Sequence, residues 1–120
     1  MRIAVTTQGK DLDAQVDSRF GRAPNFLVLD TETQHFEVVQ NSQSLDLPQG
    51  AGIQSAQNVL SYKPEVVLTG NCGPKAFRVL QAAGIKVVVG VNGRIADAIK
   101  DYLNGKYLET TEANVEGHWV

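Results

Sequence analysis

The stretch Val66-Val67-Leu68-Thr69-Gly70-Asn71-Cys72-Gly73-Pro74 joins a short apolar run to a helix pattern that begins with proline. The Val and Leu residues, bounded by Pro64 and Gly70, predict a buried strand. Pro74 followed by Lys75-Ala76-Phe77-Arg78-Val79-Leu80 predicts a helix whose first residue is proline. The loop between them therefore lies at a helix N-terminus, where unpaired backbone N–H groups and the helix dipole can hold an anion.

Upstream of this stretch the pattern predicts three strands and one helix. Arg2-Ile3-Ala4-Val5-Thr6 predicts a first strand, and residues 25–30 and 35–40 predict an antiparallel hairpin. Residues 7–24 show no sustained period, and a loop of this length is more often functional than decorative. After a polar loop, Gly50-Ala51-Gly52 leads into an amphipathic helix whose apolar residues recur at helical spacing: Ile53, Ala56, Val59 and Leu60.

Downstream, a helix, a strand and a further helix are predicted. The helix after Pro74 places on one face Ala76, Phe77, Leu80 and Ala83, and Gly84 stands where a left-handed C-terminal cap is expected. Residues 85–89 predict a strand. The last helix ends at Gly105 and carries a buried stripe of Ile95, Ala98, Ile99, Tyr102 and Leu103. Residues 106–120 are weakly patterned and predict no element.

This order of elements predicts an α/β fold with a five-stranded mixed sheet. The crossovers require the strand order 3-2-1-4-5, with an antiparallel hairpin 2-3 and helices on both faces. Ligands of such sheets collect at the carboxyl ends of the parallel strands. That edge receives Thr6-Thr7-Gln8 and Gly70-Asn71-Cys72-Gly73, and the long loop with Arg19 and Arg22 begins there.

Composition limits the class of protein. With 120 residues, 42% hydrophobic and 20% charged, we expect residues 1–120 to form a single domain. The net charge of -2 argues against a nucleic-acid partner. A lone cysteine, no apolar run near the roughly 20 residues needed to span a bilayer and no signal-peptide pattern predict a cytoplasmic protein without a membrane partner. The exposed sheet edges would permit a monomer or a weak dimer.

Three separated motifs stand out: Ser18-Arg19-Phe20-Gly21-Arg22-Ala23, Gly50-Ala51-Gly52-Ile53 and Thr69-Gly70-Asn71-Cys72-Gly73-Pro74-Lys75-Ala76-Phe77. In this order they resemble the dinitrogenase iron-molybdenum cofactor biosynthesis domain family, over about residues 1–103. The resemblance implies a ribonuclease H-like fold and a small carrier, scaffold or store of metal-sulfur clusters that works with cluster-donor or acceptor proteins. The implied cargo is an iron-molybdenum cofactor precursor, an iron-sulfur cluster, or a molybdenum-copper sulfide cluster of the kind one member holds without an ordinary set of covalent ligands.

The residues suit a large anion of this kind. Glycine lets the backbone approach a ligand closely, and arginine adds directed donors and a permanent charge. Two glycine-rich helix starts and a loop with two arginines therefore predict an electrostatic cradle for a polyanionic metal cluster. The residues expected to bind it are Thr6, Thr7, Arg19, Phe20, Gly21, Arg22, Gly50, Ala51, Gly52, Gly70, Asn71, Cys72 and Gly73.

Each feature also has a purely structural interpretation. The glycines can serve only tight turns and helix starts. The two arginines can pair with the acidic residues of the same loop, which are Asp11, Asp13 and Asp17. Phe20 is better explained as a core plug, a buried side chain that anchors the loop, than as a ligand contact.

Cys72 is the candidate metal ligand. Near a helix N-terminus its pKa is expected to fall, so that it could donate one thiolate to a metal. Stable metal sites need three or four protein ligands, however, and no CxxC or HxxxH accompanies it, which favours a small buried side chain. His35 and His118 are expected to be structural or exposed.

Enzyme classes find little support in the chain. A two-metal nuclease needs carboxylates at the sheet centre, whereas the first strand carries Ile3, Ala4 and Val5. The sequence has no GxxxxGK[ST] phosphate loop, GxGxxG fingerprint or nucleophile-base arrangement. We therefore expect a binding protein and no enzyme, with two alternatives to a cluster carrier: a small-anion or nucleotide binding module, and a protein-protein adaptor without a ligand.

Overall fold

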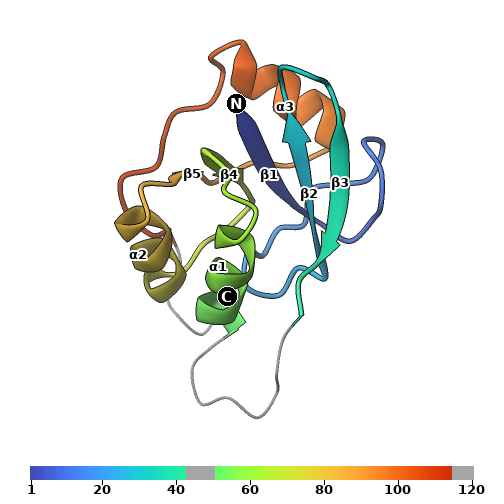
Figure 1. The fold of residues 1–120 in the computed structure, drawn as a ribbon. Helices are drawn as coiled ribbons and strands as arrows, with labels where there is room; N and C mark the ends of the chain where they lie inside the picture. The colour runs from blue at the N-terminus through green and yellow to red at the C-terminus, as the bar shows by residue number, and fades with distance from the viewer. Residues whose placement is uncertain (43–50, 115–120) are drawn as a thin grey trace.

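The computed structural model describes residues 1–42 and 51–114 of the chain. Figure 1 shows the fold, in which five strands and three helices follow one another in the predicted order. Their bounds are β1 (Arg2–Thr7), β2 (Asn25–Asp30), β3 (Phe36–Gln40), α1 (Ala51–Leu60), β4 (Val66–Leu68), α2 (Pro74–Ala82), β5 (Lys86–Val88) and α3 (Ile95–Leu103).

The strands form one sheet in the order β3-β2-β1-β4-β5. The pairs β1·β2 and β2·β3 are antiparallel, and β1·β4 and β4·β5 are parallel. In the centre of the sheet, Ile3 lies opposite Leu29 on one side and Val66 on the other. The predicted α/β class, strand order and hairpin are confirmed, whereas the ribonuclease H-like assignment stays a prediction.

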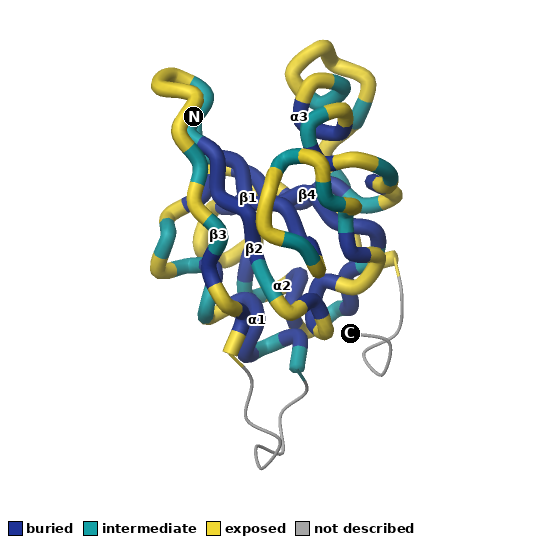
Figure 2. Tube along the Cα trace, turned by 90° about the vertical axis from the view of Figure 1, so that its right-hand side faces the viewer, coloured by how far each residue is buried: buried dark blue, intermediate teal, exposed yellow. Residues whose placement is uncertain are grey.

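Helices cover both faces of the sheet because successive strand residues point to opposite sides. One apolar cluster joins alternate sheet residues to α1 and α2, and includes Ala4, Phe26, Val67, Ala56, Val59, Phe77 and Leu80. The other joins the remaining sheet residues to α3, and includes Ile3, Val5, Leu27, Leu68, Ile95, Ala98 and Ile99. Figure 2 shows the central strands buried between these layers. The predicted two-sided helix cover is confirmed.

Helix ends agree with the sequence in most places. Pro74 begins α2, and Gly84 follows its C-cap with a positive φ of 78°, as a left-handed cap requires. Two predicted stripe positions are wrong: Ala83 is exposed and Leu103 is 51% exposed. Both lie at a helix end, Ala83 as the C-cap of α2 and Leu103 as the last residue of α3.

The first helix begins earlier than its apolar spacing suggested. Ala51 and Gly52 belong to the first turn of α1, and Gly52 is buried. The predicted ligand residue Gly50 lies outside the described residues, as does His118. Among the residues that the structure describes, no helix combines the length and apolar character needed to cross a bilayer.

Candidate functional site

The long loop after β1 is fastened to the carboxyl end of the sheet by threonines. Thr6 Oγ1 lies 2.9 Å from the Asp17 carbonyl oxygen and 2.9 Å from Thr69 Oγ1 on β4's continuation. The Asp17 backbone N–H donates to the Thr6 carbonyl at 2.7 Å. Thr7 Oγ1 donates to the Gln15 carbonyl at 3.0 Å. Both predicted ligand threonines are buried, and their hydroxyl groups hold the loop.

The same loop docks on the segment between β4 and α2. The Phe20 N–H donates to the Asn71 carbonyl at 3.0 Å, and Asn71 Nδ2 donates to the Ser18 carbonyl at 2.8 Å. A Cβ placed on Gly70 would lie 2.6 Å from the Cα of Ser18, a distance that real side chains do not reach. Gly70 is therefore required by the close approach of two protein backbones.

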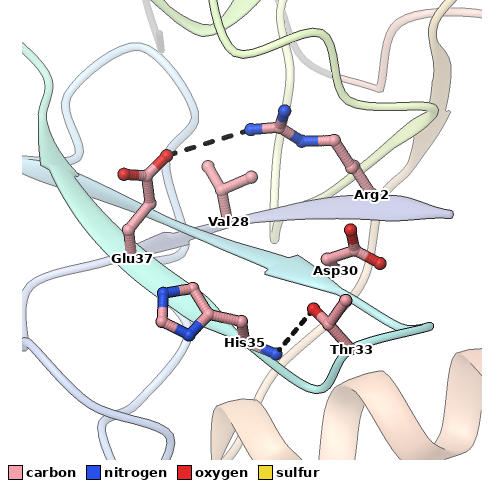
Figure 3. A pocket seen from close by; sticks show the side chains of 6 residues that line it. All are labelled: Arg2, Val28, Asp30, Thr33, His35 and Glu37. Carbon is pink, nitrogen blue, oxygen red and sulfur yellow. Dashed lines mark hydrogen bonds and ion pairs between the residues drawn. The ribbon is translucent and has the colours of Figure 1, made fainter.

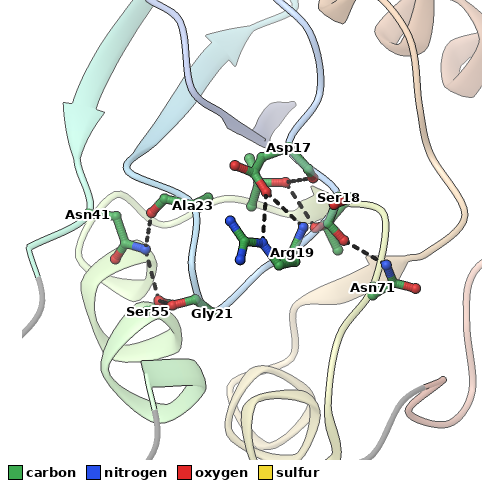
Figure 4. Close-up of polar contacts among 10 residues, drawn as sticks. Asp17, Ser18, Arg19, Gly21, Ala23, Asn41, Ser55 and Asn71 are labelled. Atoms are coloured by element: carbon green, nitrogen blue, oxygen red, sulfur yellow. Dashed lines mark hydrogen bonds and ion pairs between the residues drawn. The ribbon is translucent and has the colours of Figure 1, made fainter. Parts of the chain in front are cut away.

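On its other side the loop contacts α1. Ser55 Oγ of α1 donates to the Gly21 carbonyl at 3.0 Å, and Asn41 Nδ2 donates to the Ala23 carbonyl and to Ser55 Oγ, each at 2.8 Å. Figure 4 shows these contacts on either side of the loop. Residues 18–23 therefore lie between Asn71, which precedes α2, and Ser55 of α1, two residues after the second motif. We call this region, which contains or adjoins the three sequence motifs, the motif junction.

The two arginines of the motif junction differ in their surroundings. Arg19 is 50% exposed in its side chain, and its Nε lies 4.0 Å from Asp17 Oδ1, which also accepts the Arg19 backbone N–H at 2.8 Å. Arg22 is exposed and forms no ion pair with any residue in the described ranges. Asp13 pairs instead with Arg94, at 2.8 Å. The alternative of paired arginines therefore holds only for Arg19, and only at the limit of an ion pair.

Phe20 anchors the junction to the core. Its side chain is fully buried, and its ring lies 5.7 Å from that of Phe26, centroid to centroid. The core-plug interpretation of Phe20 is confirmed, and Gly21 beside it is buried as well.

Cys72 is buried within the apolar cluster under α1 and α2. Its Sγ contacts the Gly73 carbonyl oxygen at 3.7 Å, and burial raises the pKa of the thiol to about 12. The expected lowering of its pKa is wrong, because loss of hydration outweighs the field of the helix N-terminus. Among residues 1–42 and 51–114, no group of three or more His, Cys, Asp or Glu side chains could hold a metal ion.

We predict that the thiol of Cys72 stabilises the folded chain below pH 9 and loses this effect above it. The folded chain binds the thiol proton more tightly than the unfolded chain, whose pKa is near 9.0, so the contribution falls as the pH rises from 9.0 toward about 12. Thermal unfolding of wild type and Cys72→Ala over this pH range should show the difference in stability shrinking. A thiol reagent should modify Cys72 only in denaturant, and rapid modification of the native chain at pH 8 would contradict the burial.

A mixed-charge hollow lies at the opposite end of the sheet. It is lined by Arg2, Val28, Asp30, Thr33, His35 and Glu37, which Figure 3 shows around it. Arg2 pairs with Glu37 at 3.8 Å, so its charge is already balanced, and Asp30 adds a second carboxyl group. This hollow suits a polyanion poorly. His35 is exposed, as expected.

A family model described as dinitrogenase iron-molybdenum cofactor matches residues 1–105. The chain belongs to this family. The match includes all three motifs of the junction, so the family recognised from these motifs is confirmed.

Solved structures of similar proteins extend the match over nearly the whole chain. The apo form of the orange protein from Desulfovibrio gigas is 45% identical, with a TM-score of 0.90, over 95% of this chain and 96% of that one. A NifB-type protein from Thermotoga is 35% identical, with a TM-score of 0.81, over 97% of this chain and 98% of that one. An uncharacterized protein of Methanocaldococcus jannaschii is 27% identical over 95 residues, which is 77% of this chain and 80% of that protein.

Membership of the dinitrogenase iron-molybdenum cofactor family supports a role in the biosynthesis of that cofactor or in metal-sulfur cluster binding.

Sequence reasoning missed three polar residues that hold the junction, which are Asn41, Ser55 and Asn114. Asn114, in the tail with no predicted element, hydrogen-bonds to Asn71 and Cys72. Its position could not be read from the chain, because the tail has no hydrophobic period and its partners lie about forty residues earlier.

Proposed function

We propose that this chain is a cytoplasmic carrier or store of an anionic metal-sulfur cluster, bound without catalysis at the motif junction. The cargo is a molybdenum-copper sulfide cluster, an iron-molybdenum cofactor precursor or an iron-sulfur cluster, exchanged with donor and acceptor proteins. The proposal treats residues 1–120 as one domain.

The observation that carries the proposal is the convergence of the three motifs. Hydrogen bonds from Asn71 and from Ser55 to the backbone of residues 18–23 bring the arginine loop to the segment before α2 and to the N-terminal half of α1. Figure 1 shows both helices beginning at the end of the sheet where β1 and β4 finish. Two positive helix ends and two arginines are thus gathered on one side of a chain whose net charge is -2.

The charges of the junction suit a polyanion. Arg22 has no carboxylate partner among the described residues, and Arg19 is half exposed, so both guanidinium groups are available to a ligand. The N-cap of α2, Gly73, supplies no side-chain hydrogen bond to the first turn of that helix. Guanidinium groups and free backbone N–H groups form charge-assisted hydrogen bonds with anionic sulfur and oxygen atoms.

Binding of the cargo by charged groups, without a thiolate ligand, also agrees with the protonation state of Cys72. Cys72 remains protonated at neutral pH because burial raises its pKa to about 12, so it offers no thiolate there. In this proposal Arg19, Arg22 and the backbone of Ala51–Gly52 and residues 71–73 contact the cargo, whereas Thr6, Thr7, Phe20 and Gly70 support them.

Anaerobic reconstitution tests the proposal. The purified chain is incubated with tetrathiomolybdate and copper, and separately with an iron-sulfur source, and is then desalted. We expect visible absorption to remain with the protein in at least one arm, and to be lost in high salt because exposed charges are screened. Colourless protein in both arms would contradict cluster binding, and retention of phosphate or a nucleotide instead would favour a small-anion module.

A further inference from the structure

The tail after α3 is fastened along the edge of the sheet. The Thr110 N–H donates to the Val87 carbonyl of β5 at 2.7 Å, and the Val89 N–H donates to Thr110 Oγ1 at 3.1 Å. Ala113 packs against the apolar cluster under α1 and α2. Figure 1 shows this segment running beside β5 toward the beginning of α2. The tail therefore ends, within the described residues, at the motif junction.

Asn114 hydrogen-bonds to the segment that precedes α2. The Cys72 N–H donates to Asn114 Oδ1 at 2.8 Å, the Asn114 N–H donates to the Cys72 carbonyl at 3.2 Å, and Asn114 Nδ2 donates to Asn71 Oδ1 at 3.0 Å. An amide oxygen from a distant segment thus occupies a backbone donor beside the α2 N-terminus, which an incoming anion would otherwise use.

We propose that residues 110–114 form a strap that competes with the anionic cargo for the segment before α2, and that cargo binding releases the strap. This inference rests on the proposed function and adds a regulatory contact to it. Neutral amide hydrogen bonds are weaker than those an anion receives, so the cargo can displace Asn114.

The contacts that hold the strap in place are few and weak. Its described contacts are a few hydrogen bonds and one small apolar side chain, and segments of this kind open locally at low cost. Glu112 is exposed, and its Cα lies at most about 7 Å from that of Asn114, two residues further along the chain. This separation is shorter than the screening length of about 10 Å at 0.1 M salt. A polyanion bound where Asn114 docks therefore repels the Glu112 carboxylate, and with it the docked strap.

The test compares binding of tetrathiomolybdate with copper by wild type, Asn114→Ala and Asn114→Asp. Asn114→Ala removes both side-chain hydrogen bonds and is expected to lower the Kd about 5- to 10-fold, since it abolishes the competitor. Asn114→Asp keeps an acceptor for the Cys72 N–H and adds a negative charge, so it should bind no better than wild type. Asn104→Ala, at another exposed asparagine, the C-cap of α3, is the matched control and should leave the Kd unchanged.

Hydrogen exchange supplies a second readout. Loading the wild type with the same probe should strip protection from the Thr110 and Asn114 N–H groups, and unchanged protection would overturn the strap. If wild type binds and Asn114→Ala binds equally or more weakly, the strap is wrong while the proposed function stands. Binding by Asn114→Ala alone would support both, and no binding by any variant, either with this probe or with the iron-sulfur source, would overturn both.

Discussion

Replacing both Arg19 and Arg22 by alanine is expected to weaken cluster retention by about 100-fold or more, whereas Cys72→Ser should change it by about twofold at most. A hydrogen bond from a charged group contributes about 1.5–3 kcal/mol, and about 1.4 kcal/mol corresponds to a factor of ten. Arg22 has no ion-pair partner among the described residues and Arg19 has only a weak one, so little of their charge is already used. The thiol is buried and protonated, and it offers the cargo no charge.

The measurement is the equilibrium affinity for the reconstituted cluster, followed by visible absorption at several salt concentrations. The double variant Arg78→Ala/Arg94→Ala is the charge-matched control, because it removes two exposed arginines outside the motif junction. We expect the control to keep most of its affinity and the Arg19/Arg22 variant to lose most of its salt dependence. Loss of the cluster in Cys72→Ser with retention in the arginine variant would mean that the thiol is a ligand.

Phe20→Ala is expected to lower the free energy of unfolding by about 3–5 kcal/mol, the usual loss for a large buried ring. The Phe20 side chain is fully buried, packs against the Phe26 ring and lies in the cluster under α1 and α2. Its removal leaves a cavity beneath residues 18–23, so the junction should loosen together with the core. Cluster affinity, measured well below the unfolding temperature, should fall although no charged group has changed.

Chemical denaturation of wild type, Phe20→Ala and Phe36→Ala measures this effect. Phe36 is only partly buried, on the α3 side of the edge strand β3, so its removal should cost clearly less. The Phe36 variant should also keep its cluster affinity. A loss below about 1 kcal/mol in Phe20→Ala would show that the ring does not anchor the loop.

The sequence predicted the elements well because their signals are local. Alternating apolar residues, a proline at the first position of α2 and glycines after α2 and α3 mark strands and helix ends within a few residues of chain. The strand order followed from the direction of the crossovers. The predicted buried helix faces are wrong at Ala83 and Leu103, because helical spacing does not show where the surface that packs against the helix ends.

The motifs and their family were also readable from the chain, but not the role of each motif residue. Gly70 looked like a ligand contact and proves to be needed because the backbone of Ser18 lies against it. Cys72 was expected to be a small buried side chain, which is confirmed, but its pKa is raised by burial and not lowered by the helix N-terminus. Both differences depend on neighbours distant in the sequence, and so does the contact of Asn114 with the segment before α2.

The sequence by itself therefore determined the α/β order, the strand topology, the family and the three segments that form the junction, because each is written in local pattern or in motif. Only the tertiary structure decided which donors remain available at the stretch that follows β4. Thr6, Thr7 and Gly70 serve the packing of the loop, Asn114 occupies the Cys72 N–H, and Arg22 is left without an ion pair among the described residues. Hydrogen bonding and desolvation depend on contacts made through space, and these form only when the chain is folded.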